Sequence, residues 1–366
     1  MPKLVKIYTR ATRVLVSSGE IFMKVAIFAG SSEASLVARS LPLAKKLRDF
    51  MVECTVVTPL AWDSIVKGKL GHILSVVITH NPKRYVQTVI DPPDAVIIGK
   101  ISSPQIYVFQ KVLKKRGVKI IFDLNDAIFL PTGNLFGIKV RSGSFCLEDI
   151  LVESDYVTTN GHYLLNYVRG FNRNVCIIHD PIDVDLFHPK NKRKSYDKIT
   201  ITWEGNARVN YENLTLLVKP LKRIAKEYGK RVKFKIVSYL GDRRVKALFS
   251  PLEKFMEVNY GSERWLPMEE FAKALYDSDI LVAPLVKNPW YEGKSALRVG
   301  IGMAMGIPIV ASPVGEQKYV IKHGVNGFLA NSQEEWYKHL KLLIEDNKLR
   351  RKIGEEGRKP LKESFH

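Results

Sequence analysis

At 366 residues the chain is longer than one ordinary globular core, and we expect it to fold as two domains. Its composition, 46% hydrophobic and 26% charged, is typical of a packed globular protein, and no stretch reaches the roughly 20 apolar residues of a membrane-spanning helix. A formal net charge of +20 favours anionic partners, such as phosphorylated ligands, an anionic membrane surface or nucleic acid.

The first 22 residues are basic and precede MKVAIFAG, which would itself suit the start of a first strand. Residues 1–22 are therefore either an added N-terminal basic arm or a segment before a true start at Met23. They lack the continuous apolar stretch of a cleaved secretory signal, and we predict a cytoplasmic protein.

From residue 23 to residue 187, short apolar segments rich in β-branched residues alternate with segments of helical periodicity. The expected strands are 24–29, 54–58, 95–99, 119–124 and 156–159, and the expected helices include 33–50 and 105–115. Buried strands that alternate with helices predict a parallel sheet covered on both faces.

A polar, basic and turn-rich stretch follows, and we interpret residues 188–198 as an interdomain linker. The alternation then starts again over residues 199–366. The expected strands are 199–203, 233–238, 280–285 and 307–312, and the expected helices are 212–228, 267–277, 295–305 and 333–345. Two doubly wound halves predict an α/β fold with an interdomain cleft at the carboxyl ends of the strands, where such sheets bind ligands.

The cysteines and the basic clusters give two further predictions. Cys54, Cys146 and Cys176 lie far apart and form neither Cys-x-x-Cys spacing nor a pattern with histidine, which predicts buried free thiols and no metal site. The basic clusters carry no RNA-reading or DNA-binding motif. We therefore favour a peripheral contact with an anionic membrane over specific nucleic-acid binding, with a plain solvated surface as the alternative.

The first expected strand is followed by Gly30, Ser31 and Ser32, which open a helix. A tight turn with hydroxyls and free backbone N–H groups at a helix N-terminus suits an anion, although the serines would equally serve as helix caps.

Two later loops of this half also carry polar side chains. Asp123 near the end of the strand 119–124 and Asp126 just past it place carboxylates where they can orient ligand hydroxyls or act as a base. The alternative is that Asp126 caps, or Asp123 turns, the following loop. Asn125 interrupts the acidic cluster, which disfavours a metal site. His162 begins a helix after Asn160, and there it can bind a ligand or serve only as a cap or packing residue.

The second half carries the more informative loops. Glu204, Gly205 and Asn206 form a glycine-containing turn between a strand and a helix, so that backbone amides can approach a phosphate. Lys294 stands at the N-terminus of the expected helix 295–305. A lysine beside a positive helix end suits a pyrophosphate, which gains charge when a nucleoside diphosphate leaves. A surface lysine without a role is the alternative.

Residues 293–359, which begin GKSALRVGIGMAMGIPIVASPVGEQKYV, resemble the donor-domain ending of glycosyltransferase family four, in the branch that builds surface polysaccharides and lipid-linked glycans. Weaker similarities are GKISSPQ, DLNDAIF, ESDYVTTNGHYL, DPIDVDLF and WEGNARVNYENL. The resemblance implies a GT-B fold of two Rossmann-like domains. It also implies a metal-independent, retaining enzyme that uses a UDP or GDP sugar as donor substrate, without any other cofactor.

The resemblance also assigns roles to individual residues. It implies that Lys294 contacts the donor diphosphate, assisted by the amides of Ser295, Ala296 and Leu297. The remaining donor-side residues would be Glu204, Gly205, Asn206, Glu292 and Gly293. The residues facing the acceptor or the transferred sugar would be Gly30, Ser31, Ser32, Lys100, Asp126, Asn160 and His162. Of all these, Lys294, Asp126 and His162 are the predicted catalytic residues.

One position departs from the family pattern. The family usually has a glutamate, which binds the nucleotide ribose, where this chain has Ile301. Loss of that hydrogen bond is expected to cost about 1–3 kcal/mol of donor binding.

The leading hypothesis is a membrane-peripheral transferase acting on a glycan or lipid-linked acceptor. The alternatives are a noncatalytic homologue that binds nucleotide sugar or serves as a partner subunit, and a non-hydrolysing sugar-nucleotide epimerase.

Overall fold

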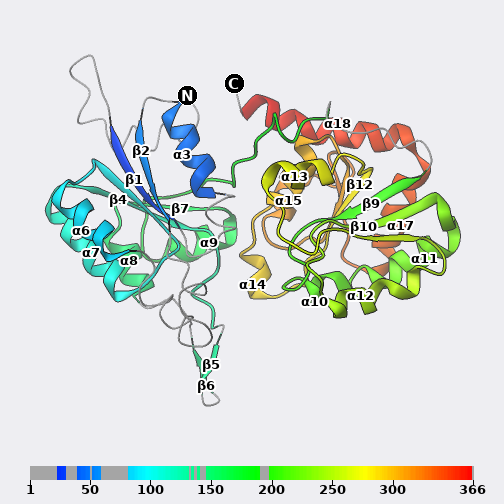
Figure 1. Ribbon diagram of the computed structural model, residues 1–366, viewed down its shortest axis with the longest axis horizontal. Coiled ribbons are helices and arrows are strands. Elements are labelled where there is room, and N and C mark those ends of the chain that lie inside the picture. Colours follow the sequence, from blue (N-terminus) through cyan, green and yellow to red (C-terminus); the bar gives the residue numbers. More distant parts are fainter. Residues whose placement is uncertain are drawn as a thin grey trace. The chain divides into compact units, whose positions relative to one another are not determined.

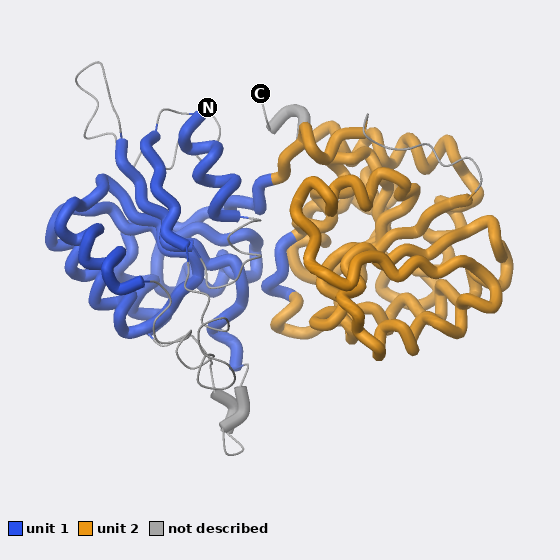
Figure 2. The backbone as a smooth tube through the Cα atoms, in the orientation of Figure 1, with its two compact units in different colours: residues 1–181, 292–295 blue, residues 182–291, 296–366 orange. Residues whose placement is uncertain are grey.

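The computed structural model describes residues 23–29, 39–49, 52–58, 81–131, 133–135, 138–140, 146–189 and 198–364. The chain divides into two compact units (Figure 2), of which unit 1 comprises residues 1–181 with 292–295, and unit 2 comprises residues 182–291 with 296–366. The predicted arm at 1–22, the loop Gly30 to Ser32 and most of the predicted linker lie outside the described residues.

Unit 1 is built on a six-stranded parallel sheet with strand order β2-β1-β3-β4-β7-β8 (Figure 1). Its strands are β1 (Lys24–Phe28), β2 (Glu53–Val57), β3 (Ala95–Gly99), β4 (Lys119–Leu124), β7 (Tyr156–Thr159) and β8 (Val175–Ile177). Its helices are α3 (Leu41–Arg48), α6 (Pro82–Ile90), α7 (Pro104–Lys115), α8 (Leu147–Glu153) and α9 (His162–Val168). A short antiparallel pair, β5 (Gly133–Leu135) and β6 (Ile138–Val140), forms a separate sheet.

The alternation of side chains along β1 explains why helices cover both faces of this sheet. Ile27 belongs to an apolar cluster with Leu47 of α3. The next residue, Phe28, points the other way and contacts the rings of Tyr85 in α6 and Phe109 in α7. The doubly wound arrangement predicted for this half is therefore confirmed.

Unit 2 repeats the architecture with a parallel sheet of order β11-β10-β9-β12-β13-β14. Its strands are β9 (Ile199–Trp203), β10 (Val232–Ile236), β11 (Glu257–Tyr260), β12 (Ile280–Ala283), β13 (Ile309–Ala311) and β14 (Phe328–Leu329). Its α-helices are α10 (Tyr211–Thr215), α11 (Val218–Tyr228), α12 (Arg243–Phe249), α13 (Met268–Ala274), α14 (Pro289–Glu292), α15 (Leu297–Ala304), α16 (Gln317–Val320), α17 (Gln333–Glu345) and α18 (Asn347–Ser364). Its largest fully buried side chains include Trp203, Phe234 and Phe249.

Several general predictions can be compared with the described residues. Cys54, Cys146 and Cys176 form no disulfide, but only Cys54 is buried, whereas Cys146 and Cys176 are half-buried, so the prediction of buried thiols was wrong for two of them. The described part of the chain contains no cluster of three or more His, Cys, Asp or Glu side chains suited to a metal ion. No described helix combines the length and the apolar character needed to cross a bilayer.

Close backbone packing of α18 against the turn after α15 makes Gly354 a position of high expected sensitivity. A Cβ atom at Gly354 would collide with the carbonyl oxygen of Gly306 and lie 2.8 Å from its carbonyl carbon. We expect Gly354→Ala to lower the free energy of unfolding by about 1–3 kcal/mol, measured by urea denaturation. At Gly357 the nearest atom is the flexible Met303 Cγ at 3.1 Å, so Gly357→Ala is the matched control and should be near neutral. Equal costs at the two positions would contradict the backbone clash.

His339, buried in α17 and stacked on Phe328, gives unit 2 a pH-dependent stability. Burial, followed by the nearby His323, lowers the pKa of His339 below its ordinary value of 6.5. The unfolded chain therefore takes up a proton at this residue before the folded chain does, and stability is lost as the pH falls below about 6.5. We expect His339→Leu to reduce this loss, measured as the urea midpoint at about pH 7.5 and about pH 5.5. An unchanged pH dependence in the variant would contradict the assignment.

Candidate functional site

The centre of the candidate site in unit 1 is the carboxylate of Asp126, which lies just past the carboxyl end of β4. Lys100, directly after β3, donates to Asp126 Oδ2, and Lys294 Nζ donates to Asp126 Oδ1 at 2.6 Å. Strands β3 and β4 are parallel neighbours with Gly99 opposite Asp123, so the loops that follow them meet at one sheet edge. The structure thus brings together Lys100, Asp126 and Lys294, which belong to three separate loops along the chain.

The charge of this cluster follows from its partners. Burial alone would raise the pKa of Asp126, but the ammonium groups of Lys100 and Lys294 outweigh burial and hold this pKa below its ordinary value. Asp126 is therefore ionised at neutral pH, and the three groups together carry one net positive charge.

The backbone at Lys100 has a conformation that side chains rarely adopt. Its φ angle is +38°, in the left-handed region, and its N–H donates to the carbonyl oxygen of Asp123 at 2.8 Å. A non-glycine residue persists there only when its surroundings determine its conformation. The ion pair with Asp126 is one such determinant, because it holds the Lys100 side chain over the end of β4.

The loop after β7 supplies the next predicted residues. Asn160 is buried, and its Nδ2 donates to the carbonyl oxygen of Asn125 at 2.8 Å, which ties this loop to the residue before Asp126. The Oδ1 of Asn160 is buried without a hydrogen-bond partner. His162 is the first residue of α9 and is half-buried. Burial, and then the charge of Glu292, raise the pKa of the neighbouring Tyr163.

Asp123, the other carboxylate at the end of β4, has a structural role. The guanidinium of Arg39 donates to Asp123 Oδ2 at 2.5 Å and Oδ1 at 2.6 Å, and Thr158 Oγ1 donates to the same Oδ1 at 2.6 Å. Arg39 also donates to Asp180 Oδ1 at 2.9 Å. These partners occupy the buried Asp123, so its carboxylate is not available to orient a ligand.

The predicted turn of unit 2 is held from one side by Arg298. The Nε of Arg298 donates to the carbonyl oxygen of Glu204 at 2.8 Å and to its Oε1 at 3.1 Å. Gly205 has φ of +128°, and a Cβ atom there would lie 2.5 Å from Arg298 Nη2 and 3.3 Å from Trp203. Glycine is therefore required at this position by conformation and by space. Asn206 accepts from the N–H of Arg208 at 3.1 Å, which fixes the turn.

The segment around Lys294 connects two short helices. Gly293 is buried, residues 294–296 have no regular structure, and α15 begins at Leu297. The residue at the N-cap of α15, Ala296, has no side-chain oxygen that could accept from the first N–H groups. Such an uncapped helix start can accept an anion. The expected start at Ser295 therefore lies two residues too early.

Ile301 belongs to the apolar core of unit 2. Its side chain is 5% exposed and lies in a cluster with Leu281 and Ile309. The preceding residue, Gly300, is packed against Ile182, whose Cδ1 would collide with a Cβ atom at this position. An isoleucine is thus compatible with its surroundings in α15, and neither position offers a hydrogen bond to a ribose.

Two arginines of these sites were absent from the sequence-based candidates. Arg298 follows Lys294 by four positions in the first turn of α15, and this basic spacing near a helix start was the available signal. Arg39 gave no signal, because its partners Asp123 and Asp180 are 84 and 141 residues away in the chain.

Residues 198–346 match the sequence model of the family Glycosyl transferases group 1. No curated protein matches the chain. Among solved structures, the glycosyltransferase from Rickettsia africae ESF-5 is similar with a TM-score of 0.66 at 14% identity, covering 95% of each chain. The sucrose-phosphate synthase from Thermosynechococcus elongatus gives 0.65 at 13% identity, over 94% of this chain and 95% of that chain. Anabaena HepE in complex with UDP and glucose gives 0.58 at 14% identity, over 94% and 95%.

These likenesses show the fold. Two six-stranded parallel sheets flanked by helices, with these neighbours, form a GT-B fold, and the predicted fold class is confirmed. The family match falls on unit 2 together with the inserted segment 292–295, and it therefore includes the turn at Glu204 and the lysine at position 294.

Proposed function

We propose that the protein is a glycosyltransferase of the family-four type. It moves a sugar from a nucleotide-diphosphate sugar, of UDP or GDP type, to a glycan or lipid-linked acceptor and retains the anomeric configuration. The observation that carries the proposal is Lys294. This lysine lies three residues before α15, inside the family match, and its ammonium already holds the carboxylate of Asp126.

The leaving diphosphate explains why a lysine is needed at this place. Transfer breaks the bond between the anomeric carbon and the donor phosphate, and negative charge develops on the phosphate oxygen. The Lys294 ammonium and the uncapped N–H groups at the start of α15 would stabilise this charge. The acceptor hydroxyl forms the new bond to the same carbon, and its proton passes to the leaving phosphate. The proposal therefore requires neither a metal ion nor a further cofactor.

The residues of unit 1 would orient the sugar or the acceptor. Asp126 is ionised at neutral pH and can accept a hydrogen bond from a sugar hydroxyl. Asn160 has a buried Oδ1 without a partner, and His162 lies on the following helix. Glu204 to Asn206 would line the nucleotide site of unit 2. Gly30 to Ser32 stay predictions outside the described residues.

Binding of nucleotides to the purified protein tests the proposal. We expect one of UDP, GDP and ADP to bind with micromolar affinity in isothermal titration at moderate salt, and the matching nucleotide sugar to be turned over with a glycan or lipid-linked acceptor. Proton NMR of the product would give the anomeric configuration. Binding without turnover would favour the noncatalytic homologue, to which Ile301 points. No binding of any nucleotide would remove the basis of the proposal.

A further inference from the structure

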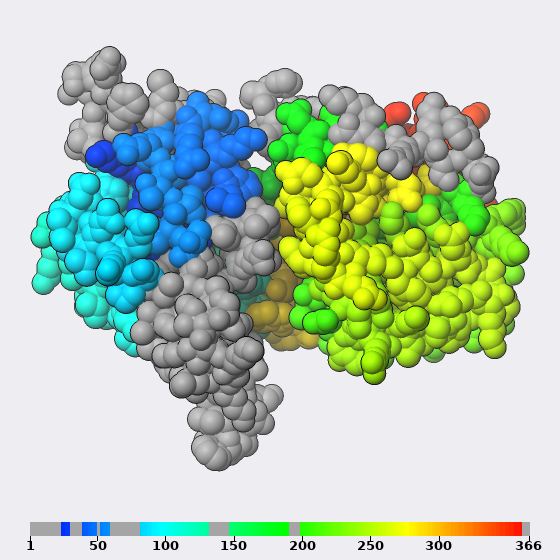
Figure 3. Space-filling view, viewed as in Figure 1, coloured from blue at the N-terminus to red at the C-terminus, as the bar shows by residue number. Residues whose placement is uncertain are grey.

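An open apolar groove of about 600 Å³ lies between α6 and α7 of unit 1. Apart from Gln105 its lining is apolar or aromatic, and it includes Pro82, Tyr85, Val89, Phe109 and Val112. Three further lining residues are far more exposed than is usual for their type: Val86 at 58%, Ile90 at 72% and Val108 at 59%. Figure 3 shows α6 and α7, in cyan, on the surface of the molecule. An apolar surface of this kind marks an interaction site.

The charged side chains on the two helices beside the groove are basic, although the exposed Asp91 directly follows Ile90 at the end of α6. Within the described helices α6 and α7 every charged side chain is basic. Lys83 precedes Val86 by three positions and Ile90 by seven, and Lys111 and Lys115 follow Val108 at the same spacings. Residues three and seven apart lie on the same face of a helix, so these lysines are on the outward face beside the groove.

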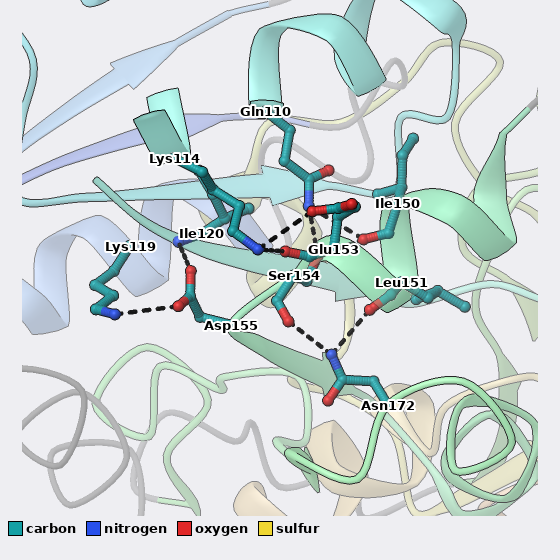
Figure 4. Close-up of polar contacts among 10 residues, drawn as sticks. All are labelled: Gln110, Lys114, Lys119, Ile120, Ile150, Leu151, Glu153, Ser154, Asp155 and Asn172. Carbon is teal, nitrogen blue, oxygen red and sulfur yellow. Dashed lines mark hydrogen bonds and ion pairs between the residues drawn. The ribbon is translucent and has the colours of Figure 1, made fainter. Parts of the chain in front are cut away.

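The opposite side of α7 is occupied by contacts with α8 and its C-cap residue Ser154 (Figure 4). Gln110 Nε2 donates to the carbonyl oxygen of Ile150 at 3.1 Å and to Ser154 Oγ at 3.2 Å. Lys114 Nζ donates to the carbonyl oxygen of Glu153 at 2.5 Å. These bonds fix the rotation of α7 about its own axis, and so they keep Val108 on the side away from α8.

We propose that this face, formed by α6 and α7, docks on an anionic lipid bilayer. Apolar side chains flanked by basic ones are the pattern of helices that lie in a membrane interface, where the apolar groups enter the headgroup region and the lysines meet lipid phosphates. Nucleic acid would not use the apolar groove, and an apolar protein partner would not require basic side chains on both helices. The docking does not depend on the proposed transfer activity.

Vesicle co-sedimentation of the full chain tests the docking. We expect binding to vesicles in which phosphatidylglycerol replaces about a third of the phosphatidylcholine, and much weaker binding to phosphatidylcholine alone. The double variant Val86→Ser/Val108→Ser leaves the net charge unchanged and should weaken partitioning at least about tenfold. Its matched control is Val152→Ser/Val209→Ser, which changes two valines that are 60% and 69% exposed elsewhere and should leave partitioning unchanged.

A second pair of variants distinguishes the effect of the lysines beside the groove from the effect of the overall net charge. Lys111→Gln/Lys115→Gln should weaken partitioning by about fivefold for each lysine, whereas Lys222→Gln/Lys226→Gln, which removes the same charge from α11, should have a much smaller effect. Unchanged thermal melting confirms that each variant is folded. Absence of vesicle binding, or equal losses in both pairs, would overturn the proposal. The proposal would also be overturned if the valine variants bound vesicles normally but lost a dimer that sedimentation velocity detects in the unmodified protein. The groove would then be an interface between copies of the chain.

Discussion

Lys294→Ala is expected to weaken binding of the cognate nucleoside diphosphate at least tenfold and to lower the rate of sugar transfer by about a hundredfold to a thousandfold. A hydrogen bond to a charged group contributes about 1.5–3 kcal/mol, and loss of one preorganised donor at a developing charge costs about 2.7–4 kcal/mol. Isothermal titration and initial-rate measurements at one fixed ionic strength give the two effects separately.

Two comparison variants make this result interpretable. Lys287→Ala removes an exposed lysine seven residues away and should leave both quantities unchanged. Asp126→Asn removes the negative charge that Lys294 contacts, so we expect it to keep or raise nucleotide affinity while it lowers the rate of transfer. If Lys294→Ala and Lys287→Ala bound the nucleotide equally well, Lys294 would not be a diphosphate ligand.

The largest loss of stability is expected for Arg39→Met in unit 1. Burial alone would lower the pKa of Arg39, but Asp123 and Asp180 raise it above its ordinary value, so the guanidinium is a fixed positive charge. Removing it leaves two nearly buried carboxylates, whose side chains are 8% and 9% exposed, without their cation. Breaking a buried pair in this way costs about 3–5 kcal/mol, which urea denaturation would measure.

The same measurement on related variants checks the cause. Arg173→Met, at an exposed arginine of unit 1, should change stability by less than about 0.5 kcal/mol. Adding Asp123→Asn to Arg39→Met should recover part of the loss, since it removes one of the orphaned charges. A cost at Arg39 that is no larger than the cost at Arg173 would contradict the role of this arginine.

The fold was largely predictable because its central strands are short segments rich in apolar and β-branched residues. The predicted strands 95–99, 119–124, 156–159 and 199–203 coincide with β3, β4, β7 and β9. Strands β8, β11 and β14 were missed, since they are short edge or near-edge strands of two to four residues that give no periodicity. The predicted helix 212–228 is broken at Leu216 and Leu217 into α10 and α11, although its apolar spacing continues across the break.

The residues of the candidate site could be predicted one at a time, but the contacts among them could not. Asp126 and Lys294 were selected because they lie in loops between strands and helices, and Lys100 was selected through the family resemblance. Nothing in the sequence indicates that two lysines share one carboxylate, because Asp126 and Lys294 are 168 positions apart. The buried network of Arg39 was missed for the same reason, and this is why Asp123 was considered functional.

The division of the chain has a consequence for synthesis on the ribosome. Residues 1–181 contain every strand of the first sheet, yet the four residues 292–295 that complete unit 1 are translated more than a hundred residues later. At a synthesis rate of roughly 5–20 residues per second, about 10–30 s pass between the translation of Asp126 and that of Lys294. During this interval Lys100, translated earlier, is the lysine that can neutralise the carboxylate. A nascent chain stalled after residue 181 should therefore form the first sheet, with the Asp126 carboxylate paired to Lys100 alone.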